Sequence, residues 1–248
     1  MMKHPLLPPR ATPAGARFRV DRLHVRFFLI LCAVAAPAFA VSLSDISNKD
    51  AVGGLKQALS QGATKAVATL GKPDGFLGDP RVRIPLPDSL QKAEGMMRRF
   101  GMGKQADELV TSMNRAAESA VTEAKPLLLD AVKTMSVEDA KKILNGGDDA
   151  ATQYFRNKTA APLTQKFLPI VRQATARAQL AEKYDQFAGA GKRFNLVKEE
   201  DAKLENYVAR KALDGMYLMI AEEERAIRQN PVGAAGGLAK KVFGALGR

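Results

Sequence analysis

Serine near lysine and closely spaced carboxylates are the residues of this sequence best suited to chemistry. Ser89 and Lys92 have the Ser-x-x-Lys spacing in which a lysine can take the proton of a serine nucleophile. Penicillin-recognising enzymes carry further motifs beside Ser-x-x-Lys, and those motifs are missing from the chain. Because Ser89 follows Pro-Leu-Pro-Asp, the run favours a helix start, with Asp88 or Ser89 capping the first turn.

A second run with chemical potential is Gly-Gly-Asp-Asp at residues 146–149, followed by Tyr154. Its acidic pair, Asp148 and Asp149, could contribute oxygen ligands to a metal or to a small polar ligand. A glycine that ends one helix and an aspartate that caps the next is the favoured interpretation. We keep Asp148, Asp149 and Tyr154 as candidate ligand-binding residues.

Glu222, Glu223 and Glu224 form the third acidic run. Consecutive residues on a helix point about 100° apart, so these side chains cannot converge on one proton. The sequence therefore predicts a solvated helix face. A carboxylate enzyme would instead need acids from different helices, such as Asp148 and Glu222, to meet in one cleft.

The longest irregular segment, residues 71–87, is rich in glycine and proline and is the best candidate for a functional surface. Long loops in compact domains are often functional, and an apolar Phe-Leu pair distinguishes this one from a disordered linker. It lacks the glycine spacing of a phosphate loop and the ligand spacing of an EF-hand. A structured connector packed on the helices is the favoured alternative to a ligand site. The candidate residues are Lys72, Asp74, Phe76, Asp79 and Arg81.

The first forty residues are typical of a cleaved secretory signal peptide. A basic stretch precedes fourteen uncharged residues at 27–40, fewer than the roughly 20 that span a bilayer. Ala38 and Ala40 form a small-x-small cleavage site, which predicts a mature start at Val41. Cys32 offers a lipoprotein alternative, but the bulky Leu31 before it disfavours lipidation. We therefore expect a periplasmic protein of the bacterial envelope.

Cleavage would remove both histidines and the only cysteine, and tryptophan is absent throughout. The predicted mature chain thus lacks the usual ligands of zinc, haem and iron–sulfur sites, and we expect no cofactor and no metal of that kind. A histidine-activated serine or cysteine nucleophile is excluded on the same ground. The six basic residues and one acid of the leader lower the net charge from +12 to about +7 when they are removed.

Apolar residues at three- and four-residue steps predict an all-α fold, a single multi-helix bundle with one long Pro/Gly-rich loop. We expect the helical domain at residues 41–230, followed at 231–248 by a glycine-rich hinge and a short basic amphipathic helix. Ser136 with Asp139 resembles a capping box, Pro126 and Pro162 suit first-turn positions, and Gly146 suits a helix end. The predicted helices cover residues 45–70, 89–100, 104–125, 126–135, 137–144, 149–158, 162–187, 204–228 and 238–246.

Three segments carry a resemblance to a known family: LGKPDGFLGDPRVRIPLP at 70–87, GGDDAATQYFRNKT at 146–159 and ALDGMYLMIAEEERAIRQNP at 212–231. From Leu43 to its end the chain resembles an uncharacterised family of exported bacterial proteins, domain of unknown function 4197. The resemblance implies an exported helical protein. It supplies no reaction, ligand or catalytic residue.

Three functions remain open from the sequence. The favoured one is a non-enzymatic binding or interaction protein whose partner is an envelope protein or a small ligand. The second is a hydrolase or lyase that uses carboxylates or lysine. The third is weak peripheral contact with anionic membrane through the C-terminal helix, whose Leu238, Val242, Phe243 and Leu246 can line one side. The favoured alternative for that helix is that the same apolar side docks on the bundle. Nucleic acid is not an expected partner of an envelope protein.

Overall fold

The computed structural model describes residues 48–88, 91, 98–99, 103–176, 203–230, 237 and 242–243. By its contacts the chain divides into two units, residues 1–38 and 39–248, and every described residue belongs to the second. Several predictions fall outside the described residues. They are the predicted leader, the Ser89–Lys92 pair, most of the helices predicted at 89–100 and 238–246, and the end of the helix predicted at 162–187.

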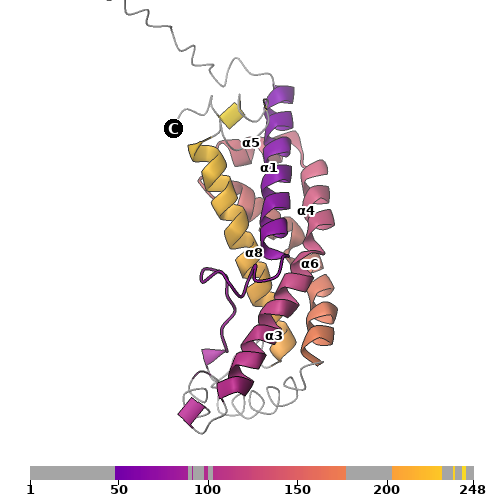
Figure 1. Cartoon of the computed structure of the whole chain (residues 1–248). Helices are drawn as coiled ribbons and strands as arrows, with labels where there is room; N and C mark the ends of the chain where they lie inside the picture. The colour runs from indigo at the N-terminus through magenta and orange to yellow at the C-terminus, as the bar shows by residue number, and fades with distance from the viewer. Residues whose placement is uncertain are drawn as a thin grey trace, which may run out of the picture. The chain divides into compact units, whose positions relative to one another are not determined.

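The described residues form helices and the segments that connect them and contain no strand, which confirms the predicted all-α bundle. The helices are α1 (Asn48–Leu70), α3 (Gly103–Val121), α4 (Ala124–Lys133), α5 (Val137–Leu144), α6 (Ala150–Ala176) and α8 (Leu204–Gln229). Helix α8 packs against α6, α1 and α3, and α4 packs against α1 and α6. Figure 1 shows α1, α4, α6 and α8 side by side, with the loop that follows α1 crossing in front of α8.

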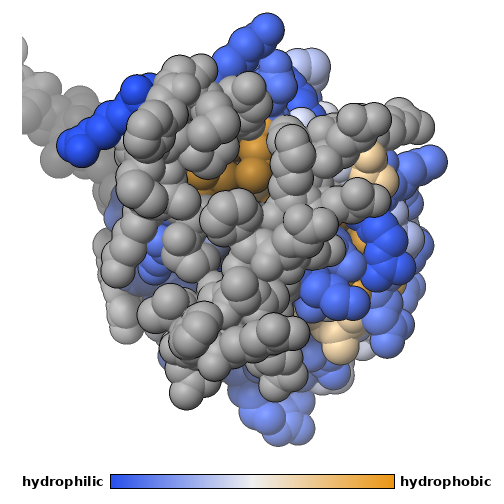
Figure 2. Space-filling model, turned by 90° about the horizontal axis from the view of Figure 1, so that it is seen from below, coloured by the Kyte–Doolittle hydropathy of each residue, from blue (hydrophilic) through white to orange (hydrophobic). Residues whose placement is uncertain are grey.

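The core that holds these helices together is made of aliphatic and aromatic side chains from every one of them. Its largest fully buried members include Tyr217, Phe155, Phe167, Met113 and Leu128. Each such side chain contributes about 1.5–3 kcal/mol when it is withdrawn from water. Seen from below, the described surface is mostly hydrophilic, with a small apolar area (Figure 2).

Helix α6 corrects one prediction, because residues 150–176 form a single helix where two had been expected. Pro162 therefore lies inside a helix and not in a first turn, and Pro169 lies inside it as well. An interior proline costs about 3 kcal/mol. The helix continues because its buried stripe, in four-residue steps, passes both prolines without including them. That stripe consists of Phe155, Thr159, Leu163, Phe167, Val171 and Thr175.

Elsewhere, short-range sequence signals correctly predicted the start and the end of α5. Ser136 accepts the N–H of Asp139, whose side chain accepts the N–H of Ser136, so the predicted capping box is present at the start of α5. Gly146 follows the C-cap Asn145, as predicted for a helix end. Pro126 lies in the first turn of α4, although that helix begins two residues earlier than expected.

Candidate functional site

The loop predicted as a functional surface is bound tightly to α3 and α8. Phe76 is fully buried, and its ring lies where Gly215 of α8 leaves room for it. A Cβ atom at Gly215 would come within 2.8 Å of Cε1 of Phe76. The absence of a side chain at this helix position therefore lets the loop approach α8 closely.

A buried carboxylate on α3 holds the first part of this loop. Oε1 of Glu118 accepts the backbone N–H groups of Phe76 and Leu77 at 3.1 and 3.3 Å. Its Oε2 accepts from Arg115 at 2.7 Å, and Arg115 in turn reaches Asp74. The hydrogen bond with Glu118 raises the pKa of Arg115. Asp74 has a φ of 64°, a left-handed conformation that aspartate tolerates better than most residues. These side-chain hydrogen bonds therefore hold the first part of the loop in its conformation.

In the second part of the loop, buried and exposed residues alternate, and the backbone pairs with a side chain of α3. Val82, Ile84 and Leu86 are buried, while residues 81, 83 and 85 are exposed. Asn114, fully buried on α3, accepts the N–H of Ile84 and donates to its carbonyl, each at 2.9 Å. One amide side chain thus takes both roles of a neighbouring strand.

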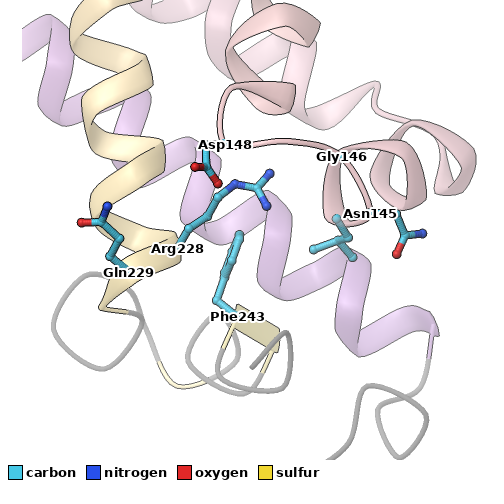
Figure 3. Close-up of a pocket in the computed structure, with 7 residues that line it drawn as sticks. Asn145, Gly146, Asp148, Arg228, Gln229 and Phe243 are labelled. Carbon is cyan, nitrogen blue, oxygen red and sulfur yellow. The ribbon is translucent and has the colours of Figure 1, made fainter. Parts of the chain in front are cut away.

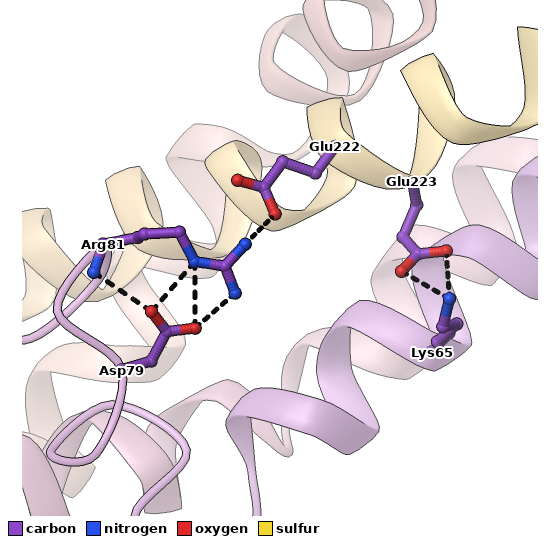
Figure 4. A network of polar contacts seen from close by, with 5 residues as sticks. All are labelled: Lys65, Asp79, Arg81, Glu222 and Glu223. Atoms are coloured by element: carbon purple, nitrogen blue, oxygen red, sulfur yellow. Dashed lines mark hydrogen bonds and ion pairs between the residues drawn. The ribbon is translucent and has the colours of Figure 1, made fainter. Parts of the chain in front are cut away.

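Two further charged residues of the loop, Asp79 and Arg81, take part in ion pairs at the surface of α8 (Figure 4). Arg81 pairs with Asp79 in the loop and with Glu222 on α8. The hydrogen bond from Arg81 holds the pKa of Asp79 below its usual value. Figure 4 also shows Lys65 of α1 meeting Glu223 at 2.8 Å. Lys72 is exposed.

Glu224 differs from its two neighbours, and here the prediction of a solvated acidic face was wrong. Its residue is only 5% exposed, because it lies on the same side of α8 as Ile220 and Ile227. Oε1 accepts the N–H of Ala151 and Oε2 the N–H of Thr152, both at 2.9 Å. These are first-turn donors of α6, which an N-cap residue would otherwise bind.

The prediction that an aspartate caps the first turn of α6 was also wrong. The carboxylate of Asp149 accepts from the side chain of Gln153, while Glu224 binds the backbone donors from the neighbouring helix. Arg228, one turn beyond Glu224, donates to it and also to the carbonyl of Ile143 near the end of α5. A single acid–base pair of α8 thus joins the end of α5 to the start of α6. The four-residue steps Ile220, Glu224, Arg228 are the sequence signal that could have revealed it.

A cavity of about 360 Å³ lies beside this joint, and we call it the end pocket (Figure 3). It is lined by Leu144, Asn145, Gly146, Asp148, Arg228, Gln229 and Phe243. Figure 3 shows the Arg228 side chain reaching from α8 toward the turn that carries Asp148, with the ring of Phe243 beside it. The centre of that ring lies 6.0 Å from Cζ of Arg228. Phe243 and Val242 are buried and belong to the core.

A second, more open groove of about 450 Å³ is lined in part by the same turn. Asp149 and Tyr154 line it together with Asp139, Lys142 and other polar residues. Burial raises the pKa of Tyr154, whose hydroxyl donates to the carbonyl of Ala131 at 2.7 Å. The Tyr154 hydroxyl is therefore already hydrogen-bonded within the protein.

The eight candidate residues thus fall into two groups. Those of the loop bind one another, α3 or α8, except for the exposed Lys72, and Phe76 is inside the core. Asp148, Asp149 and Tyr154 surround the turn between α5 and α6, where Asp148 lines the end pocket. Arg228, Gln229, Asn145 and Phe243 complete this pocket and were not foreseen. Within the described ranges, no group of three or more acidic, histidine or cysteine side chains is arranged to hold a metal.

Comparison with known proteins identifies the family. The model of the family described as "Protein of unknown function (DUF4197)" matches residues 45–244, most of the chain. The chain belongs to the DUF4197 family. No curated protein and no solved structure matches it. In this DUF4197 member, no helix among the described residues is both long and apolar enough to cross a membrane.

Proposed function

We propose that this protein is exported to the bacterial periplasm and there binds a small ligand in the end pocket without transforming it. Export is supported by the basic stretch, the apolar stretch and the Ala38–Ala40 site of the leader. Binding is supported by the pocket. Its volume falls within the range of about 300–1,000 Å³ that is common for small-molecule sites.

The observation that carries the proposal is that charged groups lining the end pocket have hydrogen-bonding capacity that no other described residue uses. Asp148 is exposed and makes no hydrogen bond or ion pair with the described residues. Arg228 uses Nε and Nη2 for Glu224 and Ile143, which leaves the two N–H groups of Nη1 for the pocket. In the loop, by contrast, Asp74, Asp79 and Arg81 are bound to other side chains.

The arrangement favours binding over carboxylate catalysis. Asp148 is the one acid among the described residues that line the end pocket. Glu222, the acid that a shared catalytic cleft would have needed, is bound by Arg81 in the network at the loop. General acid/base chemistry with two carboxylates requires both at one reacting centre. The pocket offers one carboxylate, one guanidinium and an aromatic ring.

Ligand binding can be tested by measuring the melting temperature of the purified protein against a library of small polar metabolites. We expect at least one compound to raise it, and Gln229→Trp, which fills the pocket from an exposed position, to abolish that effect. Gln173→Trp is the control, because Gln173 is exposed on α6 and does not line the pocket. A compound whose effect survives Gln229→Trp would place the site elsewhere. Absence of any effect would contradict the proposal.

Export is tested separately by expressing the full-length gene in a bacterium and sequencing the N-terminus of the protein from the periplasmic fraction. We expect the sequence to begin at Val41. A start at a lipidated Cys32, or retention of the whole leader in the cytoplasm, would refute this part of the proposal.

A further inference from the structure

We infer that the end pocket recognises a small zwitterion, a free α-amino acid or short peptide with an apolar side chain. The inference rests on the proposed function, because it names the ligand class of the same pocket. Its basis is the combination of two opposite charges with an aromatic wall in one cavity.

The positive side of the pocket is Arg228, which is held rigidly. Three of its N–H groups donate to Glu224 and to the carbonyl of Ile143, at 2.9–3.2 Å. Its side chain is 13% exposed. No fully buried side-chain nitrogen lacks a partner among the described residues, so Nη1 is accessible, and Arg228 lines the pocket. A fixed guanidinium edge with two remaining donors suits a carboxylate.

The negative side is the turn between α5 and α6. Asp148 contributes a full charge, and the C-terminal end of α5, whose Leu144 and C-cap Asn145 line the pocket, contributes the partial negative charge of a helix C-terminus. No ion pair within 4.0 Å joins Arg228 to Asp148, so the carboxylate is not bound by the guanidinium. An ammonium group placed beside this turn would find the counter-charge that the fold leaves open.

These two sides together select a ligand with both charges. Glu224 already balances Arg228, so with Asp148 the pocket carries a net negative charge, which disfavours a simple anion. A simple cation would leave the Nη1 donors of Arg228 unused. A zwitterion satisfies both groups, and the ring of Phe243 offers an apolar surface for its side chain.

Calorimetric titration of the purified protein with three matched compounds tests the inference. L-phenylalanine carries both charges, phenethylamine lacks the carboxylate, and 3-phenylpropionate lacks the ammonium. We expect L-phenylalanine to bind, and each singly charged analogue to bind about tenfold more weakly or worse. Asp148→Asn should weaken L-phenylalanine and phenethylamine by about tenfold without weakening 3-phenylpropionate.

Asp149→Asn is the matched control, since it removes the same charge from the neighbouring residue, which lines the groove and not the end pocket. It should leave all three affinities unchanged, and both variants should melt like the parent. Equal binding of all three compounds, tightest binding of 3-phenylpropionate, or binding of none would each overturn the zwitterion. If a library compound still binds and Gln229→Trp abolishes that binding, the proposed function stands while the ligand class fails.

Discussion

Replacing Glu224 by glutamine should destabilise the protein far more than the same change at Glu222 or Glu223. The three residues are consecutive and chemically identical, and only their surroundings differ. Glu224 is 5% exposed and binds two first-turn N–H groups of α6 as well as Arg228. The other two acids make surface ion pairs with Arg81 and Lys65.

The magnitude follows from the atoms involved. Both carboxylate oxygens of Glu224 accept hydrogen bonds, and an amide can supply only one oxygen, so its NH₂ group would face donors. Arg228 would also lose its counter-charge in a nearly buried position. Breaking a buried pair from one side costs about 3–5 kcal/mol. Glu222→Gln and Glu223→Gln should each cost about 0–1 kcal/mol, as surface ion pairs do.

Urea unfolding at neutral pH, followed by the helical circular dichroism signal, measures these differences. With a slope of about 2 kcal/mol per molar, Glu224→Gln should lower the midpoint by roughly 2 M. A double variant that also carries Arg228→Met should recover part of the loss, since it leaves no unpaired charge. The reasoning is refuted if Glu224→Gln falls within about 1 kcal/mol of its two neighbours.

Four further substitutions test how the loop and the helices are held. Gly215→Ala should lower the free energy of unfolding by about 1 kcal/mol or more, because its Cβ meets a buried ring at 2.8 Å. Gly62→Ala, with its nearest contact at 3.5 Å, should instead raise it by about 0.5–1 kcal/mol, and both are read from urea midpoints. Asn114→Ala should cost about 2–4 kcal/mol and expose the loop backbone to amide hydrogen exchange. Asp139→Asn should cost about 0.5–2 kcal/mol at pH 7, with the difference from the parent vanishing in acid.

The sign of that last effect follows from the capping box. Hydrogen bonds from Ser136 lower the pKa of Asp139 in the folded state. The carboxylate therefore contributes its full stability above its unfolded pKa, about 3.9, and loses it as the pH falls through the lower folded value. Urea midpoints of parent and variant should converge below about pH 4. A constant difference across that range would show that the aspartate acts only through packing. For the loop, equal effects of the two glycine substitutions would contradict the close approach to α8.

Local sequence signals identified the helices because helix boundaries depend on neighbouring residues. The capping box at Ser136 and the glycine at 146 each act within one turn, so their types and spacing were enough. The error at Pro162 arose because a proline is a local penalty, whereas the buried stripe that outweighs it extends along the whole of α6. The stripe is visible in the sequence when it is followed past the proline.

The roles of the polar residues were decided by tertiary structure. No rule within one segment distinguishes Glu224 from Glu222, since one faces the start of α6 and the other faces Arg81 only after α8 has packed. Asn114 binds the backbone of Ile84, thirty residues away. Carboxylates and amides act over about 3 Å, so their partners depend on which distant segments the apolar core brings together.

The candidate site shows the same division. The sequence pointed to Asp148 through its acidic run, but the end pocket also needs Arg228 and Phe243, which are distant in the chain. Composition and helical periodicity by themselves determined the all-α class, the boundaries of most helices and the absence of histidine and cysteine after residue 40. Packing decided which charged side chains are paired with other residues and which line a cavity without a partner among the described residues, because burial and pairing are properties of the assembled helices.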